Sequence, residues 1–84
     1  MKRIVLSEHA VHRLATRGTN EEEVHRAVLE GLREPAKGNR WMCRLNYQYE
    51  SEWQGKYYTI KQVAPIIIEK PEEITVITVY TFFF

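Results

Sequence analysis

Three side chains that could act on a phosphate group share one spacing near the start of the chain. His9, Arg13 and Arg17 follow one another at intervals of four residues in the segment SEHAVHRLATRG. Residues four apart lie on one face of a helix, so the three would form a single ridge. Arginine binds phosphate through its planar fork, and a neutral His9 could act as a base. The spacing predicts a site for an anionic ligand; solvated surface, or a structural tie to a strand carbonyl, is the alternative.

Aromatic and basic side chains are interleaved in the middle of the chain. Six of the ten aromatic residues fall within residues 41–58, among Lys and Arg residues. Exposed aromatic rings stack on bases, and cations between them neutralise phosphates. We therefore expect Arg44, Lys56 and Tyr58 to bind RNA. Core packing is the alternative for half of these aromatic residues, because they share one face of a predicted strand.

Metal-ligand spacings are not recognisable in the chain. Cys43 is the only cysteine, which excludes an internal disulfide, and its place in a strand-like segment indicates packing. His9 and His12 have no matching group of Cys, His or carboxylate residues elsewhere. We therefore expect neither a metal nor another cofactor.

The ridge requires a helix, and the local signals predict one over residues 8–17. Ser7 is a good N-cap, and Gly18 stands where a left-handed C-terminal residue is expected. On a helical projection the core-facing stripe consists of Ala10, Val11, Leu14 and Ala15.

A second helix is predicted over residues 21–32. Asn20 is its N-cap, and Glu23 would complete a capping box. Apolar residues recur at helical spacing after Glu23, and Gly31 with the segment REPAKGN ends the pattern.

The remaining segments have the period of β-strands. We expect residues 3–6 to form a short first strand or an extended entry to the first helix, and residues 40–50 alternate between apolar and polar side chains. Residues 56–70 form a second long strand, in which Pro65 requires an edge position or a bulge. Residues 74–84 are the richest in β-branched and aromatic side chains, so we expect this strand to be central or the most buried.

This order predicts an α+β fold, in which an N-terminal helical hairpin packs on a three- to four-stranded antiparallel sheet. Alternate residues of the last strand would pack under the helices. The alternative is an apolar strand covered by an antitoxin-like protein or by a second copy of the chain, and the unusual ending TFFF favours such a partner.

The size and charge of the chain limit the possibilities further. Its 84 residues form one domain, 1–84, and the 44% hydrophobic and 27% charged composition is that of an ordinary globular protein. No apolar segment approaches a membrane span or a signal peptide, so we expect a cytoplasmic protein without membrane contact. Residues 1–19 carry a net charge of +3 and residues 20–34 a net charge of −3. Such segregation can produce a basic face on a nearly neutral protein.

Short motifs at both ends of the chain point to a family. They are Ser7, His9, Ala10, Arg13, Arg17 and Gly18, the segment EEEV and the final ITVITVY. In these motifs the chain resembles small bacterial domains of unknown function with a Ser-x-His-Ala helix ending in Arg-Gly and a VITVY strand. That family is similar to barnase, colicin-type and RelE/ParE-type toxin nucleases, which cut RNA without metal. The resemblance implies a RelE/barnase-like fold and a site at His9, Arg13 and Arg17, with Thr78 or Tyr80 contributing from the last strand.

The predicted function is that of a metal-independent ribonuclease of the toxin type, within a toxin–antitoxin pair. His9 would take the proton of a 2′-hydroxyl group, and Arg13 and Arg17 would hold the phosphate. Lys61 or Tyr80 would give further stabilisation. The alternative is a non-catalytic module that binds nucleic acid or protein through the same ridge or through the apolar last strand.

Overall fold

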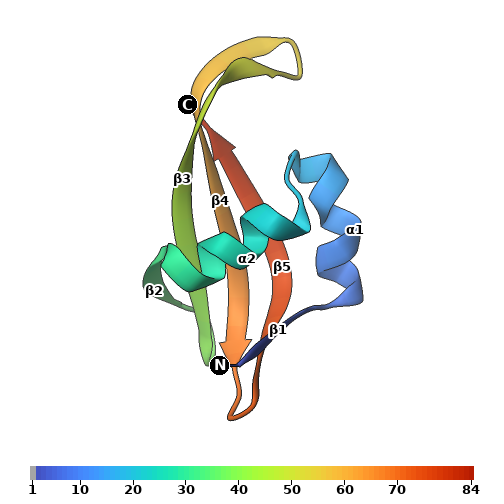
Figure 1. Cartoon of the computed structure of the whole chain (residues 1–84), viewed down its shortest axis with the longest axis vertical. Helices are drawn as coiled ribbons and strands as arrows, with labels where there is room; N and C mark the ends of the chain where they lie inside the picture. Colours follow the sequence, from blue (N-terminus) through green and yellow to red (C-terminus); the bar gives the residue numbers. More distant parts are fainter. Residues whose placement is uncertain (1) are drawn as a thin grey trace.

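The described part of the chain forms five strands and two helices (Figure 1). The computed structural model describes residues 2–84. In chain order the elements are β1 (Arg3–Leu6), α1 (Glu8–Arg17), α2 (Glu21–Glu30), β2 (Leu32–Ala36), β3 (Arg40–Trp53), β4 (Lys56–Glu69) and β5 (Glu73–Phe83). The strands form one sheet in the order β1-β5-β4-β3-β2, with β1 parallel to β5 and the other neighbours antiparallel. The predicted α+β class is therefore confirmed.

The predicted arrangement within that class is wrong. β1 precedes both helices and pairs with Glu73–Val76 of β5, so the helices are inserted between strands of a five-stranded mixed sheet. They do not form an N-terminal hairpin on three or four antiparallel strands. β2 adds a strand where we expected a loop. Its sequence LREPA shows no alternation because β2 is an edge strand, whose first four residues are all exposed.

Both helices begin where their capping residues predict. α1 follows Ser7, whose hydroxyl accepts a hydrogen bond from a first-turn N–H at 3.1 Å, and it ends before Gly18 at φ +72°. α2 follows Asn20, whose side chain accepts from the Glu23 N–H at 2.9 Å. The Glu23 carboxylate contacts Lys61 at 2.8 Å, so only the Asn20 half of the predicted capping box is seen among the described residues. Neither described helix is long and apolar enough to cross a membrane.

Gly31 explains why α2 stops at Glu30, two residues before the predicted end. Its backbone is extended, with φ −73° and ψ 159°. A Cβ here would lie 2.5 Å from the oxygen of Ala27 and 2.7 Å from the oxygen of Arg44. The close approach of the helix end to β3 therefore requires glycine, and the chain turns directly into β2.

The core lies between α2 and one face of the sheet. Its ten buried residues are Ala10, Val24, Ala27, Val28, Cys43, Val63, Ile67, Ile74, Val76 and Val79. α2 crosses this face, whereas α1 stands beside β5 (Figure 1). The predicted core stripe of α1 is too wide, because Val11 is 48% exposed and Ala15 is also exposed. A helix docked at the side of a sheet buries only a narrow strip, here Ala10 and Leu14.

β4 is the middle strand of the sheet, a place that we predicted for the last strand. Pro65 lies in β4 and is fully buried, so it is not at an edge. The pairing of β4 with β5 shifts register between Ile66 and Ile67, next to this proline. The partners of these two residues are Thr78 and Val76, so the residue left without a partner, Ile77, belongs to β5. The sheet is irregular next to Pro65, but the described strands show neither the predicted edge position nor a bulge of β4 itself.

β5 directs alternate residues toward the helices, as predicted, except at Ile77, where a register shift interrupts the alternation. Its buried residues are Ile74, Val76 and Val79. Phe83 continues this face and stacks on Trp53 of the β3–β4 hairpin, with ring centroids 5.2 Å apart. Phe82 and Phe84 remain 41% and 57% exposed. The final aromatic segment is thus only partly covered by the chain itself.

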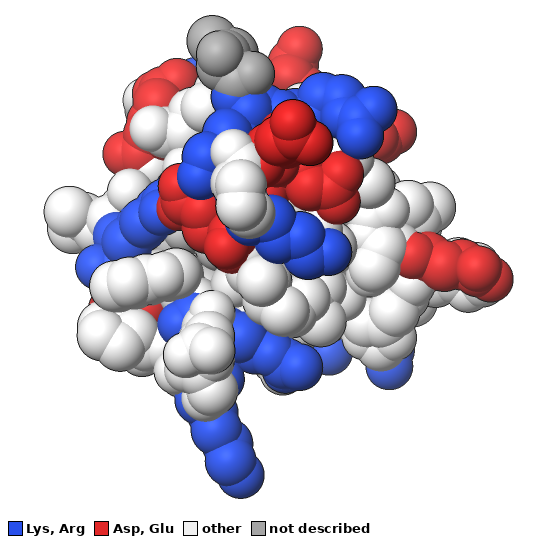
Figure 2. Space-filling model, turned by 90° about the horizontal axis from the view of Figure 1, so that it is seen from below, with Lys and Arg blue, Asp and Glu red and all other residues white. Residues whose placement is uncertain are grey.

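Ion pairs join the strand ends beside the β4–β5 turn. Glu69 accepts hydrogen bonds from Lys2 at 2.7 Å and from Arg33 at 2.5 Å. Lys2, and then Arg33, lower the pKa of Glu69 from its ordinary 4.5 to about 2. Figure 2 views this end of the molecule and shows basic and acidic side chains intermingled. Much of the positive charge at the N-terminus is therefore balanced within the fold.

Candidate functional site

α1 lies along the part of β5 that β1 leaves unpaired. β1 pairs only with Glu73–Val76. Beyond that segment the Ser7 hydroxyl donates to the Ile77 carbonyl at 2.8 Å, and the Thr81 hydroxyl donates to the Arg17 carbonyl at 2.6 Å. These bonds fasten both ends of α1 to β5, and the two elements run side by side (Figure 1).

The first part of the site joins His9 to Thr78 and Arg13. His9 Nε2 lies 3.1 Å from Thr78 Oγ1 and 3.4 Å from Arg13 Nε. An arginine Nε can only donate, so Nε2 must accept. The geometry fits a neutral imidazole with its proton on Nδ1, a tautomer assigned from the hydrogen bonds. His9 therefore presents a lone pair toward β5, as a base requires.

The second part of the site joins Arg17 to Tyr80. The guanidinium carbon lies 5.6 Å from the centroid of the Tyr80 ring, within the range of a cation–π contact. Arg17 Nε is buried without a hydrogen-bond partner among the described residues. Since buried donors are nearly always paired, this N–H is a hydrogen-bonding group that the fold does not satisfy.

An open hollow on the sheet adjoins both parts. Its lining residues are Ala36, Lys37, Arg40, Met42, Ile66, Thr78 and Tyr80. The strand residues among them alternate with core residues, which places the hollow on the face away from α2. Thr78 and Tyr80 belong both to the hollow and to the contacts with α1. The lining contains two cations and no acidic residue, so an anionic ligand could enter it.

The cations around this hollow differ from most others in having no acidic partner. Seven of the twelve Lys and Arg residues form ion pairs, namely Lys2, Arg3, Arg26, Arg33, Arg44, Lys61 and Lys70. Within residues 2–84 no ion-pair partner is found for Arg13, Arg17, Lys37, Arg40 or Lys56. The first four of these five lie on the ridge or at the hollow. The positive charge that folding leaves unpaired is therefore concentrated here.

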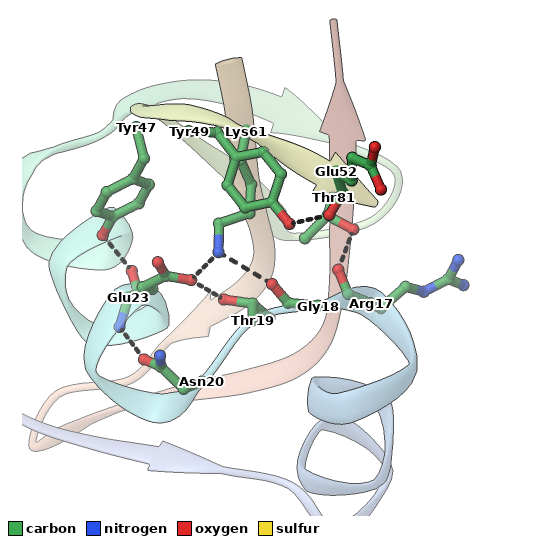
Figure 3. A network of polar contacts seen from close by, with 10 residues as sticks. All are labelled: Arg17, Gly18, Thr19, Asn20, Glu23, Tyr47, Tyr49, Glu52, Lys61 and Thr81. Carbon is green, nitrogen blue, oxygen red and sulfur yellow. Dashed lines mark hydrogen bonds and ion pairs between the residues drawn. The ribbon is translucent and has the colours of Figure 1, made fainter. Parts of the chain in front are cut away.

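Lys61, a predicted stabiliser of the reaction, belongs to a structural network (Figure 3). It is only 7% exposed, and its Nζ lies 2.8 Å from the Glu23 carboxylate and 3.0 Å from the Gly18 carbonyl. The Thr19 hydroxyl donates to the same carboxylate at 2.8 Å. This network ties the middle strand to the turn between the helices. The charge of Lys61 is thus balanced inside the protein.

The structure does not bring the three predicted RNA-binding residues together. Arg44 lies in the middle of β3, where it is paired with Glu34 and hydrogen-bonded to Gln62 at 2.8 Å. Lys56 lies over the Tyr58 ring at 5.7 Å, near the tip of the β3–β4 hairpin.

The concentration of aromatic residues has a packing explanation. The rings of Tyr49, Trp53 and Tyr58 surround Phe83, with centroid distances of 5.4, 5.2 and 5.5 Å. Trp53 also covers Gly18 so closely that a Cβ there would lie 2.8 Å from the indole. This cluster holds the β3–β4 hairpin against the turn between the helices.

The other titratable groups near the site and in the core are less well placed for acid–base chemistry than His9. His12 and Glu8 line an open hollow on the outer side of α1, next to His9 and Arg13. Among residues 2–84, no group of three or more His, Cys, Asp or Glu side chains is arranged to hold a metal ion. Cys43 is buried, and this burial raises the pKa of its thiol. The pairing of His9 with Thr78 therefore remains the arrangement best suited to acid–base chemistry.

Lys37 and Arg40 at the hollow have no predicted role, because Lys37 falls in an expected loop and Arg40 at the first position of a predicted strand. The signal for them was present in the sequence: two cations flank Gly38 in the segment AKGNR, without an acidic residue. The φ of +76° at Gly38 confirms a tight turn, which holds both cations beside the sheet.

Comparisons with family models, with curated proteins and with solved structures found no match to this chain.

Proposed function

We propose that this chain is a metal-independent ribonuclease of the toxin type, which cleaves RNA between α1 and β5. One observation carries the proposal: His9 Nε2 presents a lone pair beside Thr78 and within 3.4 Å of Arg13, and Thr78 also lines a hollow that holds two cations and no acidic residue. In a toxin–antitoxin pair the inhibitor protein would cover this same face, where Tyr80 and Phe82 are 39% and 41% exposed.

The proposed reaction uses the side chains of the chain itself. His9 Nε2 removes the proton of a ribose 2′-hydroxyl, whose oxygen then attacks the neighbouring phosphorus. Arg13 and Arg17 stabilise the additional negative charge on the phosphate oxygens. The bond to the 5′ oxygen breaks, and this oxygen takes a proton from Tyr80 or from water. The products are a 2′,3′-cyclic phosphate and a 5′-hydroxyl.

Thr78 supports this assignment of His9. Its hydroxyl lies at hydrogen-bond distance from the lone pair of Nε2, 3.1 Å away. A ribose 2′-hydroxyl could take the same place and form the same bond. Thr78 is thus a positioning residue, which holds the imidazole at the correct angle before the substrate binds.

A non-catalytic nucleic-acid-binding module is the second candidate, and one observation favours it. Both Thr78 and Arg13 already use the Nε2 lone pair of His9. If these contacts persisted with RNA bound, the unpaired arginines would bind phosphates while His9 removed no proton.

A cleavage assay distinguishes the two candidates. The purified protein is incubated with a labelled single-stranded RNA in EDTA, beside the variants His9→Ala, Arg13→Ala and His12→Ala. We expect His9→Ala to lower kcat by about 100-fold or more, the contribution of a general base. His12→Ala is the matched control, because this histidine lies on the same helix and has no hydrogen bond to β5. It should cleave like the wild type.

The chemistry is checked with the same assay. An RNA with a 2′-deoxy residue at the cleavage position should stay intact, and the products of normal RNA should end in a cyclic phosphate. Binding by the wild-type protein without any cleavage would identify a non-catalytic module. Full activity of a folded His9→Ala variant would remove His9 from the mechanism.

A further inference from the structure

A pair of cations lies on the far side of the hollow from α1. Lys37 and Arg40 belong to the hairpin between β2 and β3, and both are exposed. Together with Gly38, Asn39 and Ile68 they also line a second hollow. Two neighbouring hollows thus share the same two cations, as expected of a binding subsite and not of an isolated surface lysine.

The surface between the two groups of cations is uncharged. Ala36, Met42 and Ile66 lie between the hairpin and the β5 residues Thr78 and Tyr80. The nearby Arg44 contributes no free charge, because it is paired with Glu34. Unpaired positive charge therefore stands at both ends of the hollow, and apolar side chains lie between.

The distance between these ends exceeds the size of one phosphate group. Lys37 follows β2, which is three strand intervals from β5, and Arg40 begins β3, which is two intervals away. Because neighbouring strands are about 4.8 Å apart, the separations across the sheet are about 14 Å and about 10 Å. The arginines of α1 and the hairpin cations must then bind different phosphates. A polyanionic chain with flat apolar groups between its phosphates fits this arrangement.

We infer that Lys37 and Arg40 form a second phosphate-binding subsite, and that single-stranded RNA lies across the open sheet face from α1 to the β2–β3 hairpin. A single strand is favoured because its unstacked bases can contact the apolar floor and the Tyr80 ring, whereas a duplex hides its bases. The inference rests on the proposed function, since it states which class of RNA the proposed site binds and how that RNA lies on the protein.

Salt-dependent binding tests the subsite without requiring cleavage. The affinity of a labelled single-stranded 2′-O-methyl RNA, which cannot be cut, is measured by fluorescence anisotropy at several salt concentrations. Each phosphate contact adds about 0.7 to the slope of log K against log salt. The variant Lys37→Gln/Arg40→Gln should lower this slope by about 0.7 to 1.4, and should raise Kd by about tenfold or more for the lost charge-assisted contacts.

Arg26→Gln is the matched control, because it removes an exposed cation from α2, which lies on the other face of the sheet. It should leave the slope and Kd unchanged. Circular dichroism and the thermal midpoint establish that the variants are folded. An unchanged slope and Kd in the Lys37→Gln/Arg40→Gln variant would overturn the subsite, as would equal or stronger binding of the same sequence as a duplex.

Cleavage kinetics separate the failure of this inference from the failure of the proposed function. A dinucleoside monophosphate has only the scissile phosphate, so the Lys37→Gln/Arg40→Gln variant should cleave it like the wild type. A longer RNA should show a raised KM with the same kcat. Equal kinetics on both substrates would refute the subsite and leave the ribonuclease intact. Binding that depends on Lys37 and Arg40 without cleavage of either substrate would refute the ribonuclease and leave the subsite.

Discussion

Removal of the Glu23 charge should strongly destabilise the protein. The side chains of Glu23 and Lys61 are only 19% and 9% exposed and lie 2.8 Å apart (Figure 3). Glu23→Gln leaves the nearly buried Lys61 ammonium without a counter-charge, with a neutral amide oxygen, the Gly18 carbonyl and the Tyr49 ring as its remaining contacts. Breaking a fully buried pair costs about 3–5 kcal/mol, and the partial exposure of Glu23 reduces the expected loss to about 2–3 kcal/mol. In a domain of this size that loss lowers Tm by roughly 10–20 °C.

Urea unfolding followed by circular dichroism measures this loss. Arg26→Gln is the control, since it breaks the Arg26–Glu30 pair, whose side chains are 54% and 53% exposed, and it should leave the midpoint unchanged. The double variant Glu23→Gln/Lys61→Met should recover much of the stability, because it leaves no unpaired buried charge. Equal midpoints for Glu23→Gln and Arg26→Gln, or a double variant with the sum of the single losses, would refute the reasoning.

Three further predictions follow from the fold. Because the pKa of Glu69 is lowered from 4.5 to about 2, its stabilising effect is complete above about pH 4.5 and is lost as the pH falls toward 2. The Tm difference between the wild type and Glu69→Gln should narrow over that range, and a constant difference would contradict the assignment. Gly31→Ala should lower the free energy of unfolding by about 1–3 kcal/mol, because the added Cβ would clash with two backbone oxygens. Gly38 has a φ of +76° and open space around it, so Gly38→Ala should lower the free energy of unfolding, measured by urea titration, by about 1 kcal/mol. A smaller loss for Gly31→Ala than for Gly38→Ala would argue against the close approach of the α2 end to β3. Cys43 should resist iodoacetamide in the native state and react in urea, as mass spectrometry would show; rapid native labelling would contradict its burial.

Three of the four helix boundaries, all except the end of α2, were predictable because their signals are local. Ser7, Gly18 and Asn20 each act on backbone groups within a few residues, and the structure places all three as predicted. The parallel pairing of β1 with β5 joins segments that are about seventy residues apart, and no local pattern specifies it. β2 escaped prediction because an exposed edge strand has no buried face and hence no alternation.

The candidate site was predictable on its helical side. The helical period alone aligned His9, Arg13 and Arg17, and the structure places His9 against Thr78 and Arg17 against Tyr80. The pairing partners themselves depend on how α1 docks on β5, which no spacing in the sequence specifies.

Two kinds of information about cations were missing from the sequence. Lys61 is buried beside Glu23, which belongs to α2. The sequence alone could not show that this carboxylate balances the charge of Lys61. Lys37 and Arg40 could be assigned to the site only from the sheet order, which places their hairpin across the hollow from β5. Which cations fold into ion pairs, and which stay unpaired, is a property of the tertiary structure.

The central claim is that His9 Nε2 is the base for RNA cleavage, and chemical rescue tests it most directly. The measurement is the single-turnover cleavage rate of a folded His9→Ala variant in EDTA, with increasing concentrations of imidazole. Imidazole can enter the space that the exposed side chain leaves beside Thr78 and supply the missing base. We predict that the rate rises with imidazole concentration in His9→Ala and not in His12→Ala. A His9→Ala variant that cleaves at the wild-type rate without imidazole would contradict the claim.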